Sequence, residues 1–419
     1  MATVRHSRPV VAGDRMGKPL FVIYATVLLD AMGVGLVMPI LPGLLRGFTG
    51  AGGGASVHYG AMLAVYALMQ FLFAPILGAL SDRFGRRPVL LVSLAGAAID
   101  YLVMAGAPTL AWLYVGRVLA GVTGASAAVA TAYVTDVTPQ ADRANRYGQM
   151  GAVMGLGFIA GPLLGGVLGE WHLRAPFVAA AVVNALNFGL ALWVLPESRP
   201  PVADAARDRP NLNAFAALHR LDGTPALLPL AGVFAVIVMV AQAPMSLWIV
   251  YGQDRFGWSM MTAGASLAAF GVCHAVAQAF VTGPVVARLG ERTALLGGLV
   301  ADGLGLLLMG VVTRGWMPFA LAPLFAVGGM SVPALQATLS AQVDEARQGE
   351  LQGTLASIAS LISVAGPLVV TAAFAATRTT WPGAVWTIAA GLYLLVLPLV
   401  FNARVRPVYA ATSGTAEAS

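Results

Sequence analysis

The short stretch GALSDRFGRRPVLL (residues 78–91) joins two long apolar runs through a charged turn. Its charged residues are Asp82, Arg83, Arg86 and Arg87, and side chains of this kind are costly to place in hydrocarbon. We therefore predict a tight loop that connects two membrane-spanning helices on one side of a lipid bilayer. Gly85 lies at the centre of the turn and suits a backbone that must bend sharply.

The composition agrees with a membrane protein. Of the 419 residues, 58% are hydrophobic and 10% are charged, with a mean hydropathy of +0.80. Soluble domains carry about 25% charged residues. The net charge of +6 is explained by basic residues that orient helices, so we expect no nucleic-acid partner. The single cysteine, Cys273, excludes an internal disulfide and a cysteine-based metal site.

Twelve apolar segments reach the length of about 20 residues that a spanning helix needs. We predict an all-α membrane protein in which two pseudo-symmetric six-helix bundles cover residues 19–195 and 226–402. Residues 196–225 form a polar linker, and residues 1–18 and 403–419 form tails. The predicted spans are 19–43, 58–80, 88–107, 110–136, 146–169, 174–195, 226–252, 261–287, 293–313, 316–341, 350–375 and 381–402.

Charge predicts the orientation of these spans. If both ends of the chain lie on one side, that side holds 18 basic residues and the other side holds five. Cytoplasmic loops of membrane proteins carry the excess of Lys and Arg, so we expect both tails and the linker in the cytoplasm.

The two halves of the chain resemble each other at an offset of 205 residues. This offset places Gly85 on Gly290 and Pro39 on Pro244, and it repeats the Gly161-Pro162 pair as Gly366-Pro367. Two parallel six-helix repeats with a substrate path between them are typical of transporters.

Four charged side chains fall well inside predicted spans, away from the span ends, where each one needs a partner or a function. They are Asp30, Asp100, Asp302 and Arg117. A carboxyl group surrounded by hydrocarbon holds its proton more tightly than in water, so the aspartates suit proton exchange. The alternative is a structural ion pair, for example between Arg117 and one of them. Arg117 cannot release a proton and would instead tune a carboxylate or hold two helices together.

Uncharged polar groups also lie in predicted spans. Gln70 follows Tyr66 by one helical turn, and Gln278 follows His274 in the same way. We expect these groups on the wall of a binding cavity. His274 could exchange protons or bind substrate, or it could be a packing residue with a satisfied hydrogen bond. No P-loop and no cluster with metal-ligand spacing is present in the sequence, so we expect neither an ATP-driven enzyme nor a resident cofactor.

Several stretches together resemble one family. Residues 78–87 are similar to the signature loop between helices 2 and 3 of the major facilitator superfamily, and GPLLGG (161–166) is similar to the helix-5 motif of its drug–proton antiporters. Within that group the chain resembles the TetA-type tetracycline/H⁺ antiporters, through LLDAMGVGLVMPILPGLLR (28–46), LYVGRVLAGVTGA (113–125) and PALQATLS (333–340), among other stretches. The likeness covers residues 20 to 400.

The resemblance implies a function and a set of roles. It implies export of tetracycline, chelated to a divalent cation such as Mg²⁺, across the bacterial inner membrane in exchange for a proton. It assigns proton coupling to Asp30, Asp100, Asp302 and His274, with Arg117 as a helix-4 arginine, and substrate contact to Gln70. It assigns gating to the Asp82–Arg86 loop and to Asp136. In this interpretation Asp82 meets the N-terminal end of the eleventh predicted span (350–375), and Arg86 pairs with Asp136. Two alternatives stay open, which are a transporter of the same fold for another small molecule and a receptor or scaffold that only binds.

Overall fold

We describe the protein from a computed structural model. It describes residues 17–50, 54–124, 126–198, 227–344 and 347–402. The predicted tails, apart from residues 17 and 18, and the predicted linker from residue 199 onward lie outside the described residues.

The described residues form helices and turns. The first half contains α1 (Gly17–Val37), α2 (Leu41–Thr49), α3 (Gly54–Phe84), α4 (Arg86–Gly106), α5 (Leu110–Thr123), α6 (Ser126–Val137), η1 (Gln140–Asp142), α7 (Arg143–Trp171) and α8 (Ala175–Val194). The second half contains α9 (Leu228–Phe256), α10 (Met260–Ala277), the π-helical turn η4 (Gln278–Thr282), α11 (Gly283–Val311), α12 (Met317–Gly328), α13 (Ser331–Ser340), α14 (Gln348–Thr377) and α15 (Ala384–Asn402).

These helices account for the twelve predicted spans. Ten helical segments of the described chain are long and apolar enough to cross a membrane. One of them, Met260–Val311, is two spans long and is divided by the turn at Gly290. The shorter apolar helix at Ala384–Val400 completes the twelve. The chain is therefore an all-helical, multi-pass membrane protein, as predicted.

Three of the predicted continuous spans are broken in the structure. The first bends at Met38–Ile40, where Pro39 supplies no N–H to a helix. The fourth is interrupted at Gly124, between α5 and α6, and the tenth at Gly329–Met330, between α12 and α13. Glycine weakens a helix by about 0.5–1 kcal/mol relative to alanine. At Gly124 and Gly329 the helix can therefore be interrupted more easily by the packing of its neighbours.

The internal repeat predicted from the sequence is present in the backbone. Gly85 joins α3 to α4 with φ 101° and ψ 162°, and Gly290, 205 residues later, has φ 79° and ψ 162°. Both φ values lie in the region that favours glycine. The two charged turns thus have nearly the same backbone conformation in both halves.

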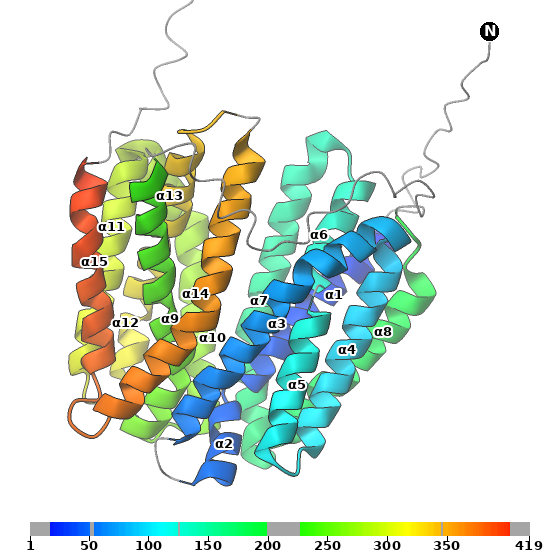
Figure 1. Ribbon diagram of the computed structural model, residues 1–419, viewed down its shortest axis with the longest axis horizontal. Coiled ribbons are helices and arrows are strands. Elements are labelled where there is room, and N and C mark those ends of the chain that lie inside the picture. The colour runs from blue at the N-terminus through cyan, green and yellow to red at the C-terminus, as the bar shows by residue number, and fades with distance from the viewer. Residues whose placement is uncertain (1–16, 51–53, 125, 199–226, 345–346, 403–419) are drawn as a thin grey trace, which may run out of the picture.

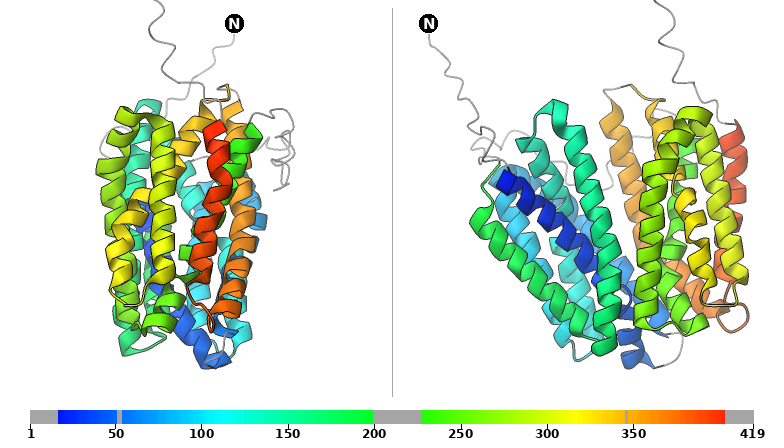
Figure 2. Two further views of the ribbon diagram at one scale, coloured as in Figure 1. Left: turned by 90° about the vertical axis from the view of Figure 1, so that its left-hand side faces the viewer. Right: turned by 180° about the vertical axis from the view of Figure 1, so that it is seen from behind.

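All spans run between two ends of the molecule, which we call the upper and lower ends as they appear in Figure 1. The start of α1, the junction between α3 and α4 and the end of α15 lie at the upper end, and α2 lies at the lower end. Figure 2 shows the two bundles side by side, close together at the lower end and diverging toward the upper end. The bundles touch where α3 packs on α14 and α7 packs on α10. Close approach of these helices relies on glycine, since Gly60 faces Thr371 and Gly264 faces Pro162 with no space for a side chain.

Candidate functional site

A cavity of about 350 Å³ lies between the two bundles. The first half supplies its charged wall, which includes Asp30 of α1, Asp100 of α4 and Arg117 of α5. The second half supplies residues of α9 and α14, including Gln242 and Ser246. A pocket with apolar walls and a few convergent polar groups has the character of a small-molecule site.

Asp100 and Arg117 form a buried ion pair in this wall. Arg117 Nη2 lies 2.7 Å from Asp100 Oδ2, and the Asp100 side chain is only 2% exposed. Arg117 also lies 6.0 Å from the centroid of the Tyr66 ring, within the range of a cation–π contact. The contact between Asp100 and Arg117 is the ion pair that the sequence left as an alternative. Proton exchange at Asp100 stays a prediction.

The pair does not satisfy all of its own polar atoms. Asp100 Oδ1 and Arg117 Nε are buried and make no hydrogen bond in the described structure. Two serines of the same cavity, Ser93 and Ser246, also have a buried hydroxyl group without a partner. Buried polar groups in proteins are nearly always paired with protein or water. A cavity with four unpaired polar atoms is therefore prepared for a polar ligand or for ordered water.

Asp30 differs from Asp100. It is half-buried on α1, lines the same cavity, and makes no hydrogen bond or ion pair with any described residue. Gln70 of α3 lines the same cavity, and its amide nitrogen donates to the Tyr66 hydroxyl at 3.2 Å and to the Gly124 carbonyl at 3.1 Å. The structure thus brings Asp30, Tyr66, Gln70, Asp100 and Arg117 together in one cavity lining. Their roles in proton coupling and substrate binding stay predictions.

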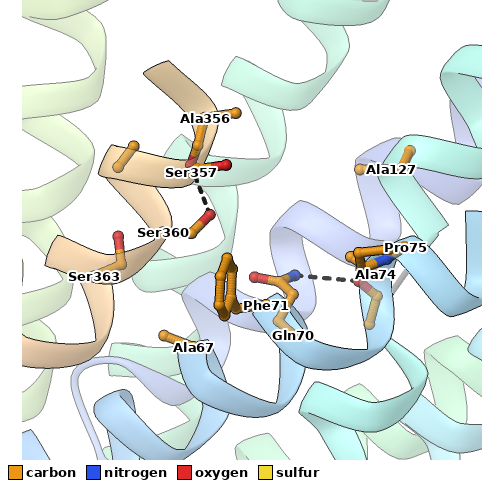
Figure 3. Close-up of a pocket in the computed structure, with 13 residues that line it drawn as sticks. Ala67, Gln70, Phe71, Ala74, Pro75, Ala127, Ala356, Ser357, Ser360 and Ser363 are labelled. Atoms are coloured by element: carbon orange, nitrogen blue, oxygen red, sulfur yellow. Dashed lines mark hydrogen bonds between the residues drawn. The ribbon is translucent and has the colours of Figure 1, made fainter. Parts of the chain in front are cut away.

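The cavity continues toward the upper end. A second cavity of about 520 Å³ shares Ala67, Gln70, Gly124, Ala127 and Ser363 with the first. Figure 3 shows Ser357, Ser360 and Ser363 of α14 across this space from Gln70 and Phe71 of α3. The two cavities together form a path from the ion pair toward the end where the bundles diverge.

A separate polar cluster lies inside the second half. Tyr393 of α15 donates its hydroxyl to Asp302 Oδ2 of α11 at 2.5 Å. Gln278 donates to the Gly329 carbonyl at 3.4 Å, and a β-carbon on Gly329 would collide with the His274 ring. A β-carbon on Gly328 would meet Asp302 in the same way.

This cluster surrounds the α12–α13 break and lies apart from the cavities. Asp302, His274 and Gln278 line neither of the two cavities described above. The Nδ1 atom of His274 is buried without a hydrogen-bond partner, and its ring stacks on Phe270. The roles predicted for these residues in proton coupling and in substrate binding stay predictions. Asp302, His274 and Gln278 lie beside the helix break and not in the linings of the two cavities.

The charged turn at the upper end is held within the first half. Arg86 pairs with Asp136 at 3.0 Å, as expected, and with Asp82 at 2.8 Å. Arg83 stacks over the ring of Phe84 at 5.2 Å, and Arg87 donates to the Leu192 carbonyl at 2.5 Å. The gating role of this turn stays a prediction.

Sequence reasoning missed Glu197 at the upper end. Its carboxylate accepts hydrogen bonds from the backbone N–H groups of Arg86 at 2.7 Å and Arg87 at 3.2 Å. An acid in this position satisfies the free donors at the start of α4 and complements the helix dipole. The only signal in the sequence was a lone acid just after the sixth span.

The lower end is closed by contacts between the halves. Arg46 of α2 forms an ion pair with Asp254 of α9 at 3.2 Å and also donates to Gln253. Gln253 donates to the Pro39 carbonyl at 3.0 Å, and Glu170 of α7 accepts from the Met261 N–H of α10 at 3.0 Å. These bonds join the two bundles on the side opposite to the divergence.

Comparison with known proteins assigns the family. The Major Facilitator Superfamily model matches residues 23–273. The chain is 52% identical to the class C tetracycline resistance protein of Escherichia coli over 383 residues, which is 90% of this chain and 95% of that protein. It is 51% identical to the class G tetracycline resistance protein of Vibrio anguillarum over 89% of this chain and 94% of that protein. The chain belongs to the tetracycline resistance proteins of the Major Facilitator Superfamily.

Solved structures agree with the fold. A mutant form of the nucleoside transporter NupG has a TM-score of 0.76 at 13% identity, over 91% of this chain and 98% of that one. The human organic anion transporter MFSD10 has a TM-score of 0.67 at 24% identity, over 91% of this chain and 99% of that one. The superfamily is one of transporters and not of enzymes, so the cavity between the bundles belongs to a transporter for a small molecule.

Proposed function

We propose that this protein exports tetracycline, as a chelate with a divalent cation such as Mg²⁺, across the bacterial inner membrane in exchange for protons. The observation that supports this most directly is the cavity with its charged wall of Asp30, Asp100 and Arg117. The relatives that share half of its residues are named for tetracycline resistance.

The cation would enter as part of the substrate. Among the described residues no group of three His, Cys, Asp or Glu side chains could hold a metal ion. Asp30 makes no hydrogen bond or ion pair with any described residue, so its carboxylate is available to attract a positively charged chelate. A proton delivered to that carboxyl group would cancel the attraction. Protonation and drug binding at Asp30 would therefore exclude each other, which is the requirement for exchange.

The orientation follows from charge. Arg83, Arg86, Arg87, Arg143 and Arg146 lie near the upper end, so we place that end and both termini in the cytoplasm. The conformation described here would then bind the drug from the inside, because the bundles diverge at the upper end and are bonded at the lower end. Two parallel bundles that rock about a central site are the general design of such transporters.

We further propose that Asp302 and His274 couple proton movement to this rocking. Both residues lie beside the Gly329–Met330 break, since Asp302 contacts Gly328 and His274 contacts Gly329, so a change in their charge would act on a flexible point of the helix. The membrane potential supplies about 2.3 kcal/mol per charge per 100 mV. If one net charge moves per cycle, this supports about 50-fold accumulation per 100 mV.

The test uses everted membrane vesicles. Vesicles with the wild-type protein should take up tetracycline with Mg²⁺ when their interior is acidified, and uptake should stop when the gradient is collapsed. Asp302→Asn should abolish uptake, whereas Asp142→Asn, at an exposed acid of the upper end, should not. Uptake that persists without a gradient would reject antiport. A growth assay in sensitive bacteria separates transport from mere binding, because only a transporter raises the tolerated drug concentration.

A further inference from the structure

The second half contributes a wall to the cavity that the sequence did not reveal. Gln242 and Ser246 are four residues apart on α9, so they lie on one face of the helix. Ser363 and Pro367 extend the same wall on α14. Their chemistry is neutral, in contrast to the charged wall on the first half.

Ser246 is the most informative of these residues. Its side chain is 1% exposed, it lines the cavity, and its hydroxyl group is buried without a hydrogen-bond partner. Leaving such a group unpaired costs about 1–3 kcal/mol. If the side chain of Ser246 served only to fill space, an alanine methyl group at this position would do so without this cost. Its presence beside a cavity indicates a partner that arrives from the cavity.

Gln242 supplies the second polar group. It is 9% exposed, and its amide makes no hydrogen bond with a described residue, unlike Gln70 on the opposite wall. Gly366 of α14 packs directly on its side chain, which holds Gln242 at the cavity. Its amide can both donate and accept hydrogen bonds.

The backbone hydrogen bonding of α14 is interrupted beside the cavity. Pro367 has no N–H, so the carbonyl of Ser363 cannot receive the usual helical bond from four residues later. The wall thus presents the amide of Gln242 and the hydroxyl-bearing side chains of Ser246 and Ser363 within two short stretches of helix.

We infer that Gln242 and Ser246 form a neutral hydrogen-bonding subsite that recognises the oxygen- and amide-bearing edge of the drug and sets its affinity, while the charged wall exchanges the cation and the proton. This inference rests on the proposed function. The two walls belong to different halves, so a drug held between them would have to release one wall when the halves separate. Loss of the neutral wall should weaken drug binding without changing the number of protons exchanged per drug molecule.

The transport test measures affinity and coupling separately. Ser246→Ala and Gln242→Met should each raise the KM for tetracycline uptake about two- to tenfold, the range expected for one neutral hydrogen bond. The ratio of protons released to drug taken up should stay at the wild-type value. Ser331→Ala removes another buried serine, 4% exposed, that lines neither cavity, and its KM should match the wild type. An unchanged KM in both cavity variants would overturn the inference.

A labelling test does not depend on transport. In a Cys273→Ser background, Ser246→Cys should react with N-ethylmaleimide in the intact protein, and tetracycline with Mg²⁺ should slow that reaction. Absence of labelling, or labelling that the drug does not slow, would contradict the subsite. The two tests can fail separately, because labelling is measured without any gradient. Wild-type vesicles that take up no tetracycline would reject the proposed function, whereas a negative labelling result would reject the subsite.

Discussion

The contacts at the lower end make a quantitative prediction about the balance between two conformations. Arg46 joins the halves there through the ion pair with Asp254 at 3.2 Å and the hydrogen bond to Gln253, beside the Gln253–Pro39 and Glu170–Met261 hydrogen bonds. We consider Arg46→Met, which keeps the apolar stem and removes both bonds. The variant should favour a state in which the lower end is open.

The size of the effect follows from exposure. The Arg46 and Asp254 side chains are 33% and 20% exposed, so their ion pair contributes about 0.2–1 kcal/mol. The hydrogen bond to Gln253 contributes about 0.5–1.5 kcal/mol. The sum, about 0.7–2.5 kcal/mol, corresponds to an increase of about three- to seventyfold in the ratio of open to closed molecules. A salt concentration of 1 M, with a screening length of about 3 Å, should reproduce part of this increase in the wild type.

Distances between spin labels across the lower end provide the assay. Thr109, between α4 and α5, and Thr380, between α14 and α15, are exposed and lie on different halves. With cysteines at these two positions and Cys273→Ser, the Arg46→Met protein should show a larger long-distance population. Arg314→Met is the control, because Arg314 is an exposed arginine of the same end that makes no side-chain bond to the other half in the described structure. A distance distribution unchanged by Arg46→Met, or changed equally by the control, would refute the reasoning.

Two further predictions concern stability. Arg117→Met leaves the buried Asp100 carboxylate without its partner and should destabilise the protein by about 3–5 kcal/mol, whereas adding Asp100→Asn should restore part of that loss in thermal unfolding of the detergent-solubilised protein. Gly290→Ala should cost about 1–2 kcal/mol because of its positive φ alone, since nothing lies within 4 Å of an added β-carbon. Gly85→Ala should cost more, because the β-carbon would also displace Glu197 from the start of α4, and equal losses would contradict this account.

The number and the approximate limits of the spans could be read from the sequence because they depend on local properties. Hydrocarbon excludes charge and demands about 20 apolar residues per crossing, so the apolar runs and the charged turns mark the helices and their ends. The fixed offset between the halves likewise predicted that Gly85 and Gly290 would adopt matching turns. Helix breaks at Gly124 and Gly329 were not predicted, because a glycine permits a break and only its surroundings decide whether one forms.

The polar residues inside the spans were also visible in the sequence, but their partners were not. Hydropathy shows that Asp100 and Asp302 must each be accommodated, and only the rotation and packing of the helices decide that one meets Arg117 and the other meets Tyr393. The same packing brings Arg46 to Asp254, 208 positions away, and turns Ser246 toward a cavity. Burial in lipid depends on each segment alone, whereas a hydrogen bond or an ion pair needs two groups within about 3 Å, which tertiary structure alone arranges.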